Sequence, residues 1–353
     1  MSGAKAGPMP PPVPQLANPH RLPLFRRIEG LPIIIVFAVL VGMFMVFSPR
    51  VFLGWPIYLS FLTTIPPMLV LALGLTMVIA AGEIDLSFPS VLAFSGFLFA
   101  FVVRDVHAAW APWLAAVVAV AGGVLVGLVN GVLVAIVGIP SIIVTIGTQF
   151  FWAGIATVLS GGLSYSLDRL SGTSLADVFT GLLFGHIPMQ ALWAAGLAVL
   201  VWLVLNRHRF GEHLLFIGDN RNVARVAGIN VMRETLKLFM LMGGLAGFAA
   251  VLLTLENLNF FANQGQGYLL PALAAVFIGG TSVFGGAGSV VGTFFGGFII
   301  GMLEAGIVAT GIEGFWVQAI VGVVFVAAVT FHLLMENPGR IATIRRVIRR
   351  SAR

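Results

Sequence analysis

The chain has 353 residues, of which 59% are hydrophobic and 9% are charged, and its mean hydropathy is +1.05. Soluble domains carry about 25% charged residues, so this composition excludes a water-soluble protein and predicts an all-α polytopic membrane protein. The sequence has no cysteine, which excludes disulfides and thiolate metal sites. The net charge of +6 comes from basic residues beside apolar segments, so we expect no nucleic acid partner.

Apolar segments recur along the whole chain between short polar breaks. A helix that crosses a bilayer needs about 20 mostly apolar residues. We therefore predict about ten transmembrane helices, at residues 31–47, 58–80, 90–103, 112–136, 141–159, 189–205, 237–255, 268–284, 289–309 and 315–334. The third and eighth segments are short enough to be broken or re-entrant.

The distribution of Lys and Arg predicts the topology, because loops rich in these residues stay in the cytoplasm. With both termini cytoplasmic, sixteen of the nineteen basic residues lie on the cytoplasmic side, and only Arg50, Arg104 and Arg169 lie outside. The predicted organisation is a Pro-rich cytoplasmic lead-in (1–30), one transmembrane domain (31–334) and a basic cytoplasmic tail (335–353). The domain contains one substantial basic loop, at residues 206–236.

The second to fifth and the seventh to tenth segments resemble each other in outline, which indicates an inverted repeat. Each set contains a break in helical pattern, at 81–90 and at the glycine-rich run 279–289. Because non-helical backbone at membrane depth needs protein or water around it, we expect both breaks inside the bundle or at its cytoplasmic mouth. Gly123, Gly127 and Gly131, and likewise Gly288, Gly292 and Gly296, share a helix face and predict close helix packing.

Several polar residues within the apolar segments are candidates for a substrate path. Ionisable groups are costly in a membrane and often functional, and carboxylates accept hydrogen bonds from polyol hydroxyls. The candidates are Glu83, Asp85, Asn130, Thr145, Thr148 and Gln149. The alternative is helix capping for the two acids and bonding between helices for the other four. Glu304, near the end of its segment, is expected at the surface.

The basic loop contains a short amphipathic pattern between a capping residue, Asp219 or Asn220, and Gly228. The spacing predicts a helix over residues 220–227, with Val223 and Val226 on one face and Arg221 and Arg225 on another. Such a helix either docks on a partner protein or lies against lipid headgroups. For the docking interpretation the contact residues are Arg221, Asn222, Val223, Arg225, Val226 and Gly228.

Four blocks in order along the chain resemble permeases of ribose-type (monosaccharide) ABC importers. They are residues 82–87, residues 127–131 with 139–140 and 145–148, residues 209–231, and residues 279–282 with 285–289. The sequence departs from that family's pattern at Glu83 and Pro89, where glycine is usual. The resemblance identifies 206–236 as a coupling loop and implies a permease homodimer in the bacterial inner membrane. It also implies a cytoplasmic ATPase that holds ATP and Mg, and a periplasmic sugar-binding protein.

The resulting interpretation is a permease subunit that imports a small sugar or related polyol, with the lipid bilayer as its solvent. An ABC permease for nucleosides is an alternative, and so is an ion-coupled secondary transporter that uses Glu83, Asp85 and Glu304. An enzyme is not expected, because no nucleophile, base and orienting group can be proposed together. The scattered histidines indicate no metal site, and the phosphate-loop signature is absent, so no cofactor is expected in this chain.

Overall fold

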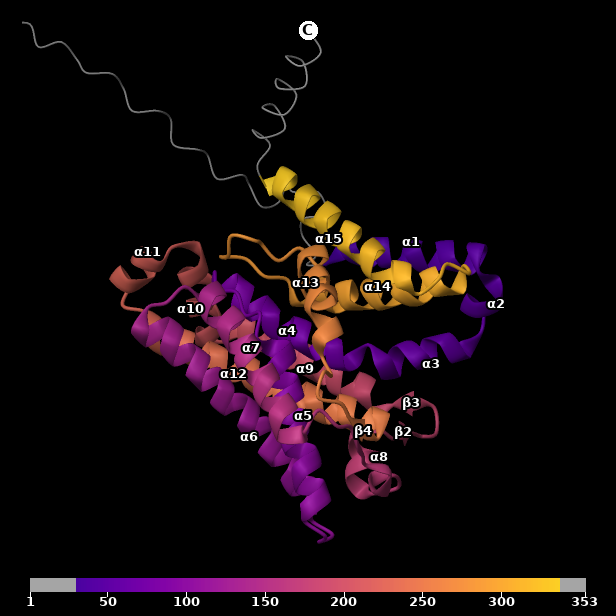
Figure 1. Cartoon of the computed structure of the whole chain (residues 1–353). Helices are drawn as coiled ribbons and strands as arrows, with labels where there is room; N and C mark the ends of the chain where they lie inside the picture. The colour runs from indigo at the N-terminus through magenta and orange to yellow at the C-terminus, as the bar shows by residue number, and fades with distance from the viewer. Residues whose placement is uncertain (1–29, 337–353) are drawn as a thin grey trace, which may run out of the picture.

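The computed structural model describes residues 30–336, which form a mostly helical bundle (Figure 1). The principal helices are α1 (Leu31–Phe47), α3 (Trp55–Thr64), α4 (Pro66–Ala80), α5 (Phe88–Asp105), α6 (Ala111–Val132), α7 (Ser141–Ser160), α9 (Met189–Arg207), α12 (Val231–Asn257), α13 (Leu269–Ile278), α14 (Val290–Ala309) and α15 (Phe315–Glu336). Shorter helices are α2 (Pro49–Phe52), the π-helix η3 (Leu133–Val137), η4 (Asp168–Leu170), α8 (Ser174–Thr180), α10 (Arg209–Asp219), α11 (Arg221–Val226) and η5 (Gln266–Tyr268). All ten predicted segments therefore contain helix.

Six helices are long and apolar enough to cross a membrane within residues 30–336, and seven if the bent pair α3–α4 counts as one span. Three other apolar helical segments are shorter than 18 residues: α1, the segment Gln266–Ile278 that includes α13, and the apolar part of α15. The structure thus confirms a polytopic helical membrane protein, and the count of ten remains a prediction. The lead-in and the tail lie outside the described residues.

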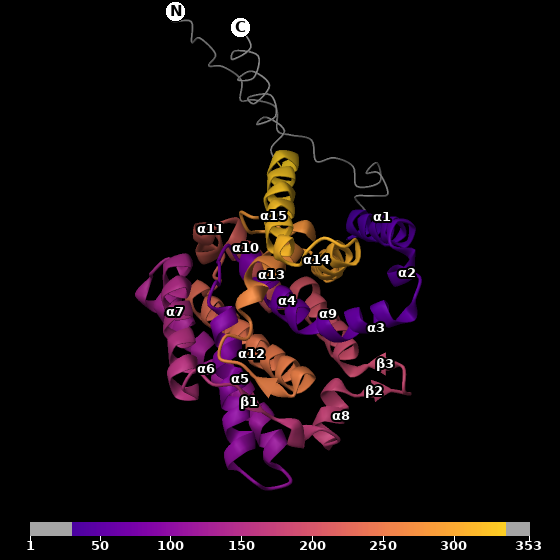
Figure 2. The same cartoon turned by 45° about the vertical axis from the view of Figure 1, so that its right-hand side comes forward.

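The segment predicted as one helix over 58–80 is broken, and its two parts meet at an angle of 50°. Pro66 and Pro67 stand at the first positions of α4, directly after Ile65. Proline lacks the backbone N–H and its ring clashes with the preceding turn, so a continuous helix cannot pass through this pair. The segment predicted as one helix is therefore two helices, α3 and α4, which together are long and apolar enough for one span. Every residue of α4 is buried, and Figure 2 shows α4 near the centre of the bundle.

Glycines bring helix backbones into contact at the two predicted surfaces. A Cβ atom added to Gly123 or Gly127 of α6 would strike the carbonyl oxygen of Gly243 or Phe239 of α12. On α14, Cβ atoms added to Gly292 and Gly296 would strike the backbone of α13 and of the turn that follows it. Small residues allow such close packing where lipid removes the usual hydrophobic drive between helices. The packing prediction for these glycines is confirmed.

The end of the bundle away from α10 and α11 has small extended elements. β1 (Tyr165–Ser166) pairs antiparallel with β4 (Asn259–Phe260), and β2 (Leu182–Leu183) pairs with β3 (Ile187–Pro188). Strands β1, β2 and β3 and helix α8 belong to the region 160–188, which lies between α7 and α9 (Figure 1). The pairing of β1 with β4 connects the region 160–188 to the segment that follows α12, so these two parts of the chain lie together at one end of the molecule.

Candidate functional site

A buried hydrogen-bond network holds the loop at the first break in helical pattern, residues 81–87. The Asp85 Oδ1 atom accepts from the backbone N–H of Ser87 at 2.8 Å and from its hydroxyl at 2.6 Å. Asn130 Nδ2 on α6 donates to the same Ser87 hydroxyl at 2.8 Å. Asp85 is 2% exposed, and burial raises the pKa of its carboxyl while the Ser87 hydrogen bonds oppose that rise. Asp85 and Asn130 therefore join the start of α5 to α6.

Helix α7 holds the same loop from the other side. The Ile84 N–H donates to the Ser141 hydroxyl at 3.1 Å, and the Thr145 hydroxyl donates to the Ser141 carbonyl at 2.8 Å and lies 3.3 Å from the Ile84 carbonyl. Thr148 donates to the Thr145 carbonyl at 3.4 Å and is half-buried, as is Gln149. Four of the six predicted path residues, Glu83, Asp85, Asn130 and Thr145, thus converge on this loop, and Thr148 and Gln149 lie farther along α7.

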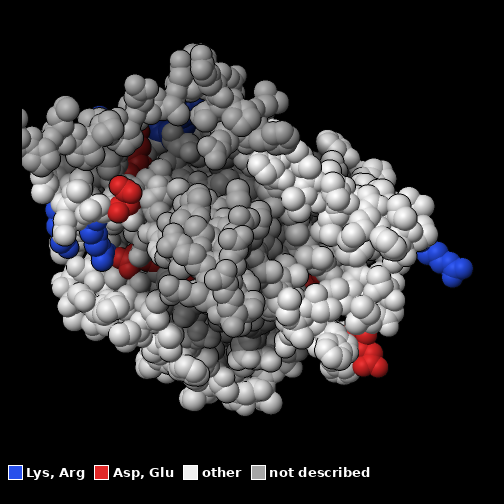
Figure 3. All heavy atoms as spheres, turned by 90° about the horizontal axis from the view of Figure 1, so that it is seen from above, with Lys and Arg blue, Asp and Glu red and all other residues white. Residues whose placement is uncertain are grey.

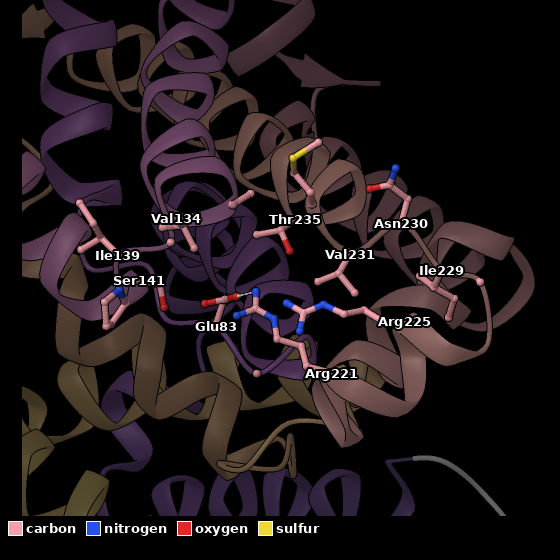
Figure 4. Close-up of a pocket in the computed structure, with 16 residues that line it drawn as sticks. Glu83, Val134, Ile139, Ser141, Arg221, Arg225, Ile229, Asn230, Val231 and Thr235 are labelled. Carbon is pink, nitrogen blue, oxygen red and sulfur yellow. Dashed lines mark hydrogen bonds and ion pairs between the residues drawn. The ribbon is translucent and has the colours of Figure 1, made fainter.

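Glu83 forms an ion pair that the sequence did not predict. Its buried carboxylate accepts a hydrogen bond from Nη2 of Arg221, the first residue of α11. The two residues line a cavity of about 780 Å³ with Arg225, Ser141 and others, and Figure 4 shows both arginine side chains extending toward Glu83. The sequence predicts Arg221 as a contact with a partner protein, and in the structure its side chain, 41% exposed, also pairs within the chain. This contact links the first break to α11.

The short helix predicted in the basic loop is present as α11. The Asn220 side chain caps it by accepting from the N–H groups of Asn222 and Val223, at 3.0 and 3.1 Å. Gly228 follows it with φ at +84°, a value that favours glycine. Ala224 is buried against Ile217 of α10, whereas Val223 and Val226 are 56% and 90% exposed. The helix therefore presents an uncovered apolar face.

Three glycine segments meet beneath α11, at a point that we call the glycine junction: Gly82, Gly218 of α10, and Gly285 with Gly286. The Gly286 N–H donates to the Ala80 carbonyl at 2.8 Å. A Cβ atom added to Gly218 would strike both the Ala80 carbonyl and the Gly286 nitrogen. The breaks of the two halves of the chain thus contact each other and α10, as backbone packed on backbone. A displacement of α10 would therefore reach both halves directly.

Charged side chains mark the same end of the molecule. Figure 3 shows Lys and Arg side chains gathered with Asp and Glu at the edge where α11 lies in Figure 1. Glu234 of α12 pairs there with Lys237 at 3.1 Å and lies 3.6 Å from His213 of α10. Arg225 of α11 is exposed and forms no ion pair with the described residues, so it adds an uncompensated positive charge at this end.

A second polar region lies on the other side of the α4 helix, and the sequence analysis missed it. A cavity of about 570 Å³, which we call the polar cavity, lies between the α3–α4 bend, the end of α12, the loop before α13, and α14. Gln264 lines it at 7% exposure, and Glu304 lines it and a neighbouring cavity of about 1020 Å³. Glu304 is half-buried, so the expectation of a surface position is wrong. The available signal was the run of Asn and Gln residues over 257–266.

Comparisons with known proteins identify the kind of subunit. Residues 57–329 match the family described as "Branched-chain amino acid transport system / permease component". The chain is 31% identical over 266 residues to the autoinducer 2 import system permease protein LsrD of Klebsiella pneumoniae subsp. pneumoniae, covering 74% of this chain and 78% of the relative. It is 30% identical over 309 residues to the D-allose transport system permease protein AlsC of Escherichia coli K12, covering 86% and 91%.

No solved structure matches the chain at a significant level. The family match covers most of the chain, from the α3 helix to α15, and therefore includes the broken loops, the glycine junction and α11. The order of elements described above is thus contained in the region that the family shares. The chain belongs to the transport-system permease family and is a membrane transport subunit rather than an enzyme.

Proposed function

We propose that this chain is the transmembrane permease of an ATP-driven importer that moves a small sugar or related polyol from the periplasm to the cytoplasm across the bacterial inner membrane. The relatives support a sugar, since one is a permease for D-allose. The ATPase, with its ATP and Mg, is a separate cytoplasmic subunit, and a periplasmic binding protein delivers the solute. This chain then supplies the pathway and the surface on which the ATPase acts.

The observation that carries this proposal is the exposed apolar face of α11 above the glycine junction. Val226 is 90% exposed, although a helix of six residues is marginal in water without a partner. Arg225, exposed on the same helix, is placed to meet acidic or carbonyl acceptors of the ATPase, where charge sets orientation. Movement of α11 would pull on Glu83 through Arg221 and on both breaks through Gly218.

The proposal that the chain is an importer permease also includes its topology, its number of spans and its oligomeric state. We infer that α10, α11 and both termini face the cytoplasm and that the region 160–188 faces the periplasm, because Lys and Arg concentrate in the loop 206–236 and in the termini. With α1, α13 and α15 counted as crossings the chain has ten spans, arranged as an inverted repeat of α3–α7 and α12–α15. A second copy of the chain completes the membrane part of the transporter. The cytoplasmic ATPase that binds this dimer has two nucleotide sites.

The proposal is tested by placing a charge on the exposed face of α11. Val226→Asp would bury an unpaired carboxylate against the ATPase, so we expect at least a tenfold loss of ATPase co-purification and of ATP-driven uptake in vesicles without an ion gradient. Val178→Asp, on the exposed α8 of the opposite face, is the matched control and should leave both unchanged. Normal co-purification with Val226→Asp would contradict an ATPase contact at α11.

A further inference from the structure

The polar cavity is bounded by elements that come from both halves of the chain. Its walls include Thr64 and Ile65 at the α3–α4 bend, Asn257 at the end of α12, and Glu304 on α14. The loop before α13 contributes Asn263, Gln264 and Tyr268. Its volume, about 570 Å³, lies within the roughly 300–1,000 Å³ of typical small-molecule sites.

Gln264 is held in place from two sides but keeps one unused polar atom. Its Nε2 donates to the Thr254 hydroxyl at 3.2 Å and lies against Gly96 of α5, where any Cβ atom would collide with it. Its Oε1 is buried and has no hydrogen-bond partner within residues 30–336. A buried amide oxygen without a partner costs free energy that a ligand hydroxyl would recover. Gln264, which lines the cavity, therefore has an amide oxygen with unused capacity to accept a hydrogen bond.

The polar groups around the cavity are acceptors and neutral donors. The Glu304 carboxyl group, the Asn257 and Asn263 amides and the Tyr268 hydroxyl line it, and no Lys, Arg or His does so among the described residues. Aromatic rings of Phe61, Phe261 and Tyr268 add flat apolar surface. Apolar walls with a few convergent polar groups are the usual composition of a small-molecule site.

We propose that the polar cavity binds the transported solute within the membrane domain and that its lining selects neutral polyhydroxy compounds over amino acids. This inference rests on the proposed function and names a site for it. Hydroxyl groups of a sugar donate to Glu304 and to Gln264, and accept from Tyr268 and the Asn amides. The apolar face of the sugar ring lies against the aromatic side chains.

The same lining disfavours a zwitterionic amino acid. Its ammonium group could pair with Glu304, but its carboxylate would lie in a cavity that has no cation and already holds a carboxyl group. A charge taken from water without a partner is strongly disfavoured. Specificity arises here as much from the missing cation as from the hydrogen bonds that are present. The chain therefore differs in substrate class from what the family's description states.

The test uses the full chain assembled with its ATPase in lipid nanodiscs. Because the sequence has no cysteine, Thr64→Cys places a single thiol in the cavity wall, and Ser166→Cys places a control thiol on the exposed β1 strand. We expect at least one neutral sugar, from a panel of pentoses and hexoses with D-ribose and D-allose, to slow maleimide labelling of Thr64→Cys. Labelling of Ser166→Cys should not change, and L-leucine should protect neither thiol.

Two substitutions connect the protection to the named groups. Gln264→Leu and Glu304→Gln should each raise the sugar concentration needed for protection by about tenfold, the effect expected from the loss of one hydrogen bond. Gln266→Leu is the matched control, since Gln266 is exposed and lines only the neighbouring cavity. These variants should co-purify with the ATPase as wild type does.

Three results would overturn the inference: protection by L-leucine, wild-type protection in both cavity variants, or ATP-driven sugar uptake with no protection of the Thr64→Cys thiol by any sugar in the panel. The last result would leave the proposed function intact. Failure of the proposed function would be recognised separately, by the absence of ATP-driven sugar uptake or by undiminished ATPase co-purification with Val226→Asp.

Discussion

The two ends of α4 differ in what packs against them. At Ala80, the helix reaches the glycine junction, where its carbonyl accepts from Gly286 at 2.8 Å and backbone packs on backbone. At Pro66, the helix begins at a 50° bend beside the polar cavity. There the Gln264 Oε1 atom has no partner within residues 30–336. At the first end backbone packs directly on backbone, and the second end borders a cavity lined by polar side chains.

This difference suits two tasks. Helix α4 is buried along all 15 residues and spans roughly 22 Å, so it connects the two ends as a packed rod. A tightly packed end transmits displacement, because close-packed interiors shift as units rather than deform continuously. An end that borders a cavity lined by polar side chains can take up and release a polar ligand without displacing packed backbone. The comparison predicts that substitutions at the junction harm the fold and that those at the cavity alter binding.

The largest effect is expected at Gly218. Gly218→Val would drive a branched side chain into the Ala80 carbonyl and the Gly286 nitrogen, which are backbone atoms that cannot turn aside. We expect a loss of about 3 kcal/mol or more in stability, at the upper end of overpacking effects, and loss of uptake. Thermal unfolding in detergent and vesicle uptake measure both.

Gly196 provides the control for that substitution. It lies on the exposed side of α9, where an added Cβ meets nothing within 4 Å. Gly196→Val should therefore unfold within a few degrees of wild type and transport normally. If Gly218→Val behaved in the same way, the junction would not be a tight contact and the contrast between the two ends of α4 would disappear.

A smaller effect is expected at Asp85. Asp85→Ala removes the acceptor for the buried Ser87 N–H and hydroxyl and should cost about 1–3 kcal/mol in unfolding free energy, the range for a buried group left unsatisfied. Asp168→Ala is the control, because Asp168 accepts from the Ser166 hydroxyl at 2.6 Å in an exposed turn where water replaces the bond. Equal unfolding temperatures for the two variants would show that the Asp85 network adds nothing to stability.

The sequence predicted the helices and the glycine contacts well, for a physical reason. Apolar length, small-residue spacing and helix caps can be recognised from nearby residues. The spacing of Gly123 and Gly127 indicates a packing face without identifying α12 as its partner, and Asn220 caps the helix that follows it. The break at Ile65 was also visible in Pro66 and Pro67, but apolar length outweighed the proline signal. Local pattern is therefore a sound guide to element type in this chain.

The sites could not be predicted as well, because they are made by contacts between distant residues. Glu83 and Arg221 are 138 positions apart, and nothing in either segment indicates the other. Gln264 gains its importance from Gly96 on α5 and Thr254 on α12, which hold its amide. Carboxylates near apolar segments indicated a substrate path at Asp85, and in the structure this group also joins helices. The six path candidates remain predictions: Glu83, Asp85, Asn130, Thr145, Thr148 and Gln149.

The smallest effect on stability is expected at the Glu83–Arg221 pair, and it tests whether the pair transmits movement. Because Arg221 is 41% exposed, solvent screens the pair, and a double-mutant cycle of Glu83→Gln and Arg221→Gln should give a coupling of about 1 kcal/mol or less in unfolding free energy. A fully buried pair would cost about 3–5 kcal/mol when one partner is removed. The exposed pair Arg104–Asp105, at 3.0 Å, is the matched control cycle.

The transport readout separates transmission from stability. If the pair connects α11 to the loop 81–87, Glu83→Gln should raise the ATP consumed per sugar imported severalfold while ATPase co-purification and folding stay near wild type. The glycine junction would still hold α10 in place, so uptake should fall without being abolished. Arg221→Gln should give the same ratio of ATP consumed to sugar imported. The double variant should have no higher ratio than either single variant, because both substitutions remove the same contact. An unchanged ratio in all three variants would assign the transmission to the junction alone.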